Sequence, residues 1–95
     1  MKPEIKPGLA VISRMGRDKG RVFVVLCEVD ADFVLVADGR GRSVHSPKRK
    51  RRKHLMPTSH EFPEITALNE QGRLTDHALR MALNRLQDSL LSDQA

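Results

Sequence analysis

The feature that most constrains the fold lies near the N-terminus, where two apolar segments flank a short basic loop. Residues 9–13 (LAVIS) and 21–29 (RVFVVLCEV) are rich in β-branched residues and predict two β-strands. The loop has a glycine near each end, Gly16 and Gly20, and glycine reaches backbone angles that other residues avoid. We therefore predict a tight loop on a rigid β frame, with its charged side chains facing solvent.

Turn signals continue the β pattern beyond this loop. A third strand is predicted over Phe33–Ala37, and the three residues before it are too few for a parallel crossover, so it forms an antiparallel hairpin. Asp38–Gly39 predicts a second tight turn, in which Gly39 is the structural residue. A shorter strand is then expected over Gly41–His45, ending before Pro47. Several short antiparallel strands favour a mainly β fold closed into a small barrel.

The second strand is apolar on both of its faces. One face holds Val22, Val24 and Leu26, and the other holds Phe23, Val25, Cys27 and Val29. A strand of this kind needs a cover on its outer side. The C-terminal segment is the candidate for that cover.

Residues 75–95 predict an amphipathic helix, with Thr75 as a suitable N-cap and Asp76 favourable at the positive end of the helix dipole. Four leucines fall on one helical stripe: Leu79, Leu83, Leu86 and Leu90. Packing on the barrel and dimerisation would each bury this stripe, and the sequence leaves both open. Residues 1–58 are then the barrel domain, and residues 59–74, with mixed polarity, are expected to be a linker.

Charge divides the chain into a basic and an acidic part. Residues 1–60 contain 14 basic and 6 acidic side chains, whereas residues 61–95 contain 3 and 6. This asymmetry favours an anionic partner for the N-terminal part. The predicted phosphate-binding residues are Arg14, Arg17, Lys19, Arg21, Arg40, Arg42, Lys48, Arg49, Lys50, Arg51, Arg52 and Lys53.

The last six of these cations form an unbroken run, Lys48–Lys53, with no apolar residue that could face a core. We expect the run to be a loop, an exposed edge or a mobile arm. For an isolated run, a solvated charge cluster or a nuclear import signal is the alternative. The cations that precede it make a continuous phosphate-binding surface the better interpretation.

Aromatic residues are scarce, and this indicates how nucleic acid is recognised. The chain has no Trp, no Tyr and three Phe residues, whereas single-strand binders usually stack bases on aromatic rings. We therefore expect recognition of structured RNA through its phosphates and shape. Charge alone leaves DNA as an alternative.

Neither a catalytic site nor a cofactor or metal is predicted. Residues 16–20 lack the Gly-Lys-Ser/Thr ending of a nucleotide-binding P-loop, and the four histidines lack metal-ligand spacing. The single cysteine, Cys27, excludes an intramolecular disulfide and suits the reducing cytoplasm. The N-terminus lacks the apolar core of a secretory signal, and no apolar run is long enough to span a membrane.

Residues 6–28 resemble the motif of the KOW-domain family, through GLAVIS, the loop GRDKG and GRVFVV around the central Gly20. Together with the basic stretch between Pro47 and Pro57, the first 58 residues look most like the single-KOW RNA-binding proteins of bacteria. Those proteins are similar to certain large-subunit ribosomal proteins of archaea and eukaryotes.

The resemblance implies an SH3-like barrel of about five strands, with Lys53–Pro57 as the last strand. It also implies a role in translation through ribosomal or other structured RNA. Its phosphate-contacting residues carry over most strongly to Arg14, Arg17, Lys19 and Arg21. The alternative is a protein-interaction module, because KOW domains also contact ribosomal proteins or RNA polymerase.

Overall fold

Five antiparallel strands form one sheet in the computed structural model, which describes the backbone of residues 4–93 and the side chains of residues 4–87. The strands are β1 (Leu9–Ser13), β2 (Val22–Glu28), β3 (Phe33–Ala37), β4 (Lys48–Arg51) and β5 (Leu55–Glu61). Their order in the sheet is β4-β3-β2-β1-β5, and each neighbouring pair is antiparallel. The first three predicted strands are confirmed, the second one residue shorter at each end.

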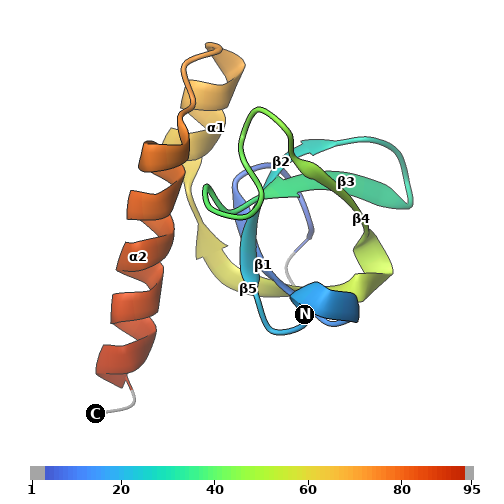
Figure 1. Cartoon of the computed structure of the whole chain (residues 1–95), viewed down its shortest axis with the longest axis horizontal. Helices are drawn as coiled ribbons and strands as arrows, with labels where there is room; N and C mark the ends of the chain where they lie inside the picture. The colour runs from blue at the N-terminus through green and yellow to red at the C-terminus, as the bar shows by residue number, and fades with distance from the viewer. Residues whose placement is uncertain (1–3, 94–95) are drawn as a thin grey trace.

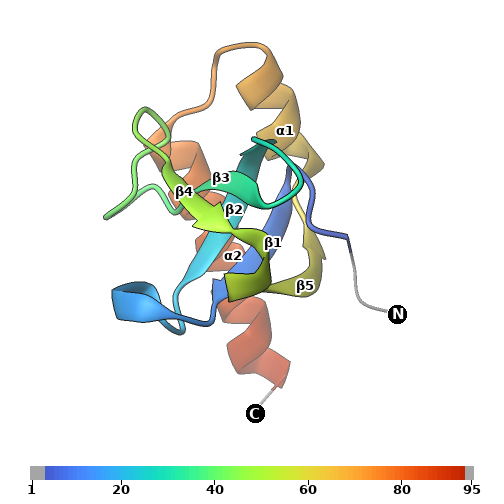
Figure 2. The same cartoon turned by 90° about the vertical axis from the view of Figure 1, so that its right-hand side faces the viewer.

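The sheet is curled rather than flat (Figure 2). Register shifts between Leu9 and Val11 in the β1–β5 pair, and between Val25 and Cys27 in the β2–β3 pair, increase strand bending. A short 3-10 helix, η2 (Arg52–His54), connects β4 to β5. No ladder joins these two strands within residues 4–93, so the expected closed barrel is not confirmed. The fold is a mainly β, five-stranded sheet with two helices.

The apolar residues of β2 divide between two clusters, one on each face of the sheet. The inner cluster contains Phe23 and Val25 together with Leu9, Val11, Val34, Val36 and Leu55. The outer cluster contains Val24 and Leu26 together with Ala10, Ala37 and residues from both helices. The expectation that the outer face of β2 needs a cover is confirmed.

Helix α1 (Pro63–Glu70) follows β5 almost directly, so the expectation of a linker over residues 59–74 is wrong. Strand β5 runs on to Glu61, which pairs with Leu9. Pro63 then suits the first helical position, where no N–H partner is needed. Ile65 is buried in the outer cluster. This helix could not be recognised in the sequence because it is only two turns long and has few apolar residues.

Helix α2 (Asp76–Asp93) runs along the outer face of the sheet (Figure 1). The Ala78 N–H donates a hydrogen bond to Thr75 Oγ1 at 3.1 Å, which confirms Thr75 as the N-cap. Leu79 and Leu86 are buried in the outer cluster and Leu83 is packed against it. Leu90 lies outside the described side chains. The stripe therefore covers the chain's own sheet, and a dimer through it is not supported.

Residues 41–45, expected as a strand, form an irregular loop between β3 and β4 instead. The Asp76 carboxylate at the start of α2 accepts hydrogen bonds from the Ser43 hydroxyl and the Val44 N–H, each at 2.8 Å. Arg80 Nη1 donates to the Gly39 carbonyl at 2.8 Å. These hydrogen bonds with α2 satisfy polar groups of the loop. Strand β4, rather than residues 41–45, pairs with β3.

Candidate nucleic-acid interface

The β1–β2 loop fixes the backbone beneath the cations of the predicted motif. Residues Gly16–Asp18 form a 3-10 helix, η1, and the Gly20 N–H donates to the Ser13 carbonyl at 2.8 Å. Gly16 and Gly20 have φ angles of +77° and +88°, which confirms that they provide the turn conformation. The exposed cations of this loop are Arg14, Arg17, Lys19 and Arg21.

Asp18 is buried at the base of the loop and binds cations from two segments. Its carboxylate lies 3.4 Å from Lys50 Nζ, 3.7 Å from Lys48 Nζ and 3.9 Å from Arg21 Nη1. Burial raises the pKa of Asp18, but the hydrogen bond and charge of Lys50, with the charges of Lys48 and Arg42, outweigh it and lower the pKa below its usual value. The carboxylate therefore stays ionised and ties the loop to β4.

Strand β4 is at one end of the sheet, so the first four residues of the basic run form an edge strand, close to one of the three expected forms. Lys48 and Lys50 lie opposite Val36 and Val34, which belong to the inner cluster, and both lysines reach Asp18. The Lys50 side chain is only 11% exposed. It also donates a hydrogen bond to the Ser13 hydroxyl at 3.2 Å.

Arg49 and Arg51 alternate with these lysines and face the other side of β4. Their guanidinium carbons lie 4.1 and 4.8 Å from the centroid of the Phe33 ring, so both stack on it. Both arginines remain exposed to solvent. The cationic side chains of β4 therefore point to two sides of the strand, the lysines toward Asp18 and the arginines toward Phe33.

The end of the run contains one structural and one exposed cation. Arg52 donates to the Ile5 carbonyl at 2.8 Å and to the Asp30 carbonyl at 3.3 Å, and lies 3.7 Å from the Glu28 carboxylate. Lys53 is exposed. Arg52, like Lys50, is engaged in contacts within the fold, so the two are set apart from the more exposed cations among those predicted to bind phosphate. The sequence alone does not indicate which of these cations bind carbonyl or carboxylate oxygens of the protein itself.

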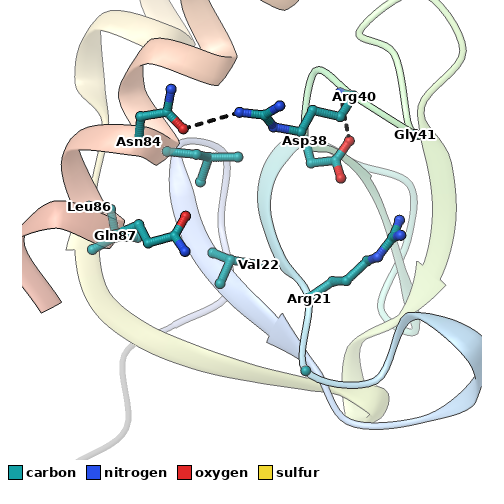
Figure 3. A pocket seen from close by; sticks show the side chains of 10 residues that line it. Arg21, Val22, Asp38, Arg40, Gly41, Asn84, Leu86 and Gln87 are labelled. Atoms are coloured by element: carbon teal, nitrogen blue, oxygen red, sulfur yellow. Dashed lines mark hydrogen bonds between the residues drawn. The ribbon is translucent and has the colours of Figure 1, made fainter. Parts of the chain in front are cut away.

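Arg40 and Arg42 lie in the β3–β4 loop. Asp38 Oδ1 accepts a hydrogen bond from the backbone N–H of each, at 2.9 Å. Gly39 has a φ of +76°, as expected for its turn. The Arg40 side chain extends toward α2, where Nη2 donates to Asn84 Oδ1 at 3.3 Å (Figure 3). Arg42 is half-buried.

The loop cations and η2 meet on one side of the molecule. The Arg14 N–H donates to the His54 carbonyl at 2.8 Å, which places η2 beside the β1–β2 loop. Strand β4 and the short helix η1 of the loop both lie away from α2 (Figures 1 and 2). We call five exposed cations of this region the basic surface: Arg14, Arg17, Lys19, Arg21 and Lys53. Within the described side chains, only Arg21 of these five makes an ion pair.

Two acidic residues that organise this region were missed by sequence reasoning. The sequence indicates Asp18 as part of a basic loop, and Asp76 as a helix-dipole residue that could also pair with Arg80. Asp18 is the sole acid among the loop residues 14–21, and that exception is the signal that could have identified it. Nothing in the sequence indicates that Asp76 binds the β3–β4 loop, because its partners are 32 and 33 residues away.

Comparison with known proteins gives a partial similarity to a curated protein. Over 44 residues the chain is 46% identical to a protein of Bacillus subtilis (strain 168) named "Putative ribosome-binding protein YbzG". The matched segment covers 45% of this chain and 60% of that relative's length. No protein-family model matches the chain. Among the described residues, neither helix is of the length and apolarity needed to cross a membrane.

Proposed function

We propose that this protein binds structured ribosomal RNA through the phosphate backbone and catalyses no reaction. The observation that supports this most is the basic surface. Its loop cations project from a backbone whose conformation is fixed by Asp18, Gly16 and Gly20. A pre-formed site loses little conformational entropy when its ligand binds. Several cations that contact phosphates together also gain from counterion release.

The ribosomal target is supported by two further observations. The motif of residues 6–28 resembles the KOW family, whose fold is an SH3-like barrel, and the curled five-stranded sheet is compatible with that architecture. The similar Bacillus subtilis protein is named for ribosome binding. A ribosomal partner would place the protein in the cytoplasm and in translation.

Recognition by phosphates and shape agrees with the environment of the aromatic rings. Phe23 and Phe62 are buried, and the Phe33 ring lies beneath Arg49 and Arg51. Base stacking on a ring is thereby disfavoured at all three positions. Arg49 and Arg51 are both exposed, so they can make further contacts with RNA.

A protein-interaction role through the leucine stripe is less well supported. Leu79 and Leu86 are 0% and 5% exposed because they pack against the sheet, so they offer no free apolar surface. We therefore place RNA binding ahead of that alternative.

Crosslinking the protein to RNA in cells and sequencing the recovered fragments tests the proposal. We expect a dominant footprint in ribosomal RNA, and we expect ribosomal proteins to be lost from pull-downs after nuclease treatment. Protein partners that survive nuclease, without an RNA footprint, would instead support the protein-interaction alternative.

A further inference from the structure

A cavity of about 520 Å³ lies between α2 and two loops, the one that precedes β2 and the one that follows β3 (Figure 3). Its volume is within the range of small-molecule sites. Five polar side chains, one of which is the Asp38 carboxylate, and an apolar floor line it. They include Arg21, Arg40, Asn84, Gln87, Val22 and Leu83.

The walls of the cavity are held in place before any ligand binds. Arg80 and Asp76 of α2 fasten the β3–β4 loop through the Gly39 carbonyl and Val44 N–H. A Cβ atom on Gly39 would lie 2.6 Å from the Asp76 carbonyl oxygen, so loop and helix are in close contact. The Arg40–Asn84 hydrogen bond then fixes one amide at the rim.

Asp38 Oδ1 is occupied by the backbone N–H groups of Arg40 and Arg42, and the other polar groups of the cavity are those that a nucleotide needs. Arg40 uses one guanidinium N–H on Asn84 and retains others for a phosphate oxygen. The Asn84 oxygen is occupied by Arg40, so its amide N–H groups remain as donors, and Gln87 offers both a donor and an acceptor. Side-chain amides recognise base edges, and the apolar floor from Val22 and Leu83 suits a ring face.

We infer that this cavity binds one unpaired nucleotide of the RNA held by the basic surface. The inference rests on the proposed function, and it adds a base-contacting site to the phosphate contacts. Arg21 connects the two regions, because it lines the cavity and also pairs with Asp18 beneath the basic loop. A strand that follows the loop cations would therefore pass the mouth of the cavity.

The test compares two RNA probes, a hairpin with an unpaired loop and a fully paired duplex of the same stem. We expect the wild-type chain to bind the hairpin about tenfold more tightly than the duplex, the scale of one good base contact. Asn84→Ala/Gln87→Ala should lose most of this preference and leave the duplex Kd unchanged. Gln71→Ala, an exposed amide at the end of α1, is the control and should keep the preference.

Asn84 and Gln87 are exposed, so the variant is expected to fold, and its thermal unfolding measures this directly. An equal Kd of wild type for both probes, or a preference that persists in Asn84→Ala/Gln87→Ala, would overturn the inference and leave the proposed function intact. Failure of the wild-type chain to bind either RNA would overturn both.

Discussion

The carboxylate of Asp18 lies 3.4 Å from the ammonium group of Lys50 and joins the β1–β2 loop to the edge strand β4. Two basic segments that are distant in sequence thus share one buried anion. Because Lys48 and Arg21 approach the same carboxylate, their mutual repulsion is reduced. Asp18 therefore helps to hold in place the loop that carries four of the five cations of the basic surface.

Asp18→Asn should destabilise the fold by about 1 to 3 kcal/mol, because Lys50 would lose its anionic partner while its side chain remains largely buried. Urea denaturation measures the free energy of unfolding. The exposed Asp32, changed to Asn, serves as the matched control and should alter stability little. An equal effect of the two substitutions would contradict a structural role for Asp18.

Acid should weaken the fold through carboxyls whose pKa is lowered. The hydrogen bonds from the Val44 N–H and the Ser43 hydroxyl hold the pKa of Asp76 below its usual value. A carboxyl whose pKa is lower in the folded than in the unfolded state stabilises the fold at pH values above its pKa in the unfolded state. This stabilisation is lost as the pH falls through its pKa in the folded state. We expect the urea midpoint to decline below about pH 4. Asp76→Asn should flatten this decline, and an unchanged acid dependence would count against the Asp76 contacts.

Two glycine substitutions separate backbone strain from close packing. Gly39 and Gly72 both have positive φ angles, but only Gly39 has neighbours, with the Asp76 carbonyl 2.6 Å from an added Cβ. Gly72→Ala should cost about 1 kcal/mol for the strained backbone alone. Gly39→Ala should cost about 1 to 3 kcal/mol more. Thermal unfolding of the pair measures the difference, and equal losses would show that loop and helix are not in close contact.

Leu79→Ala should cost about 2 to 5 kcal/mol, because the Leu79 side chain is fully buried between α2 and the sheet. Met81→Ala, on the exposed side of the same helix, should change stability by less than about 0.5 kcal/mol. The free energy of unfolding should not depend on protein concentration. A concentration dependence would indicate that the stripe packs in a dimer instead.

Strands β1, β2 and β3 and helix α2 could be predicted because their signals are local. Continuous runs of apolar and β-branched residues predicted the strands at 9–13 and 33–37, and the leucine spacing with Thr75 predicted the start of α2. The place of β4 could not be predicted, because Lys48–Arg51 contains no apolar residue. It forms a strand because β3 supplies backbone partners and Asp18 and Phe33 supply side-chain partners.

The candidate site was predicted at the level of residue type, and its geometry came from contacts across the fold. Gly16 and Gly20 were identified because positive φ angles require glycine. The division of the cations into exposed and structural ones depends on Asp18, Glu28 and backbone carbonyls, whose positions follow only from the tertiary fold. Asn84 and Gln87 were not predicted as binding residues, because polar residues on a helix are ordinarily exposed to solvent without a specific role.

Arg17→Ala/Lys19→Ala should weaken RNA binding about tenfold or more without unfolding the chain, because both side chains are exposed. Arg73→Ala/Arg85→Ala removes the same net charge from residues outside the basic surface and is the matched control. A fluorescently labelled RNA hairpin gives both Kd values. Equal losses in the two variants would indicate that only net charge matters.

The salt dependence of RNA affinity tests the central claim most directly, because it counts the phosphates that the basic surface neutralises. With about five cations engaged, the plot of log affinity against log salt should have a slope on the order of −3 to −5, and Arg17→Ala/Lys19→Ala should reduce its magnitude by about 2. A slope near zero, or one that this variant leaves unchanged, would contradict phosphate binding by the basic surface.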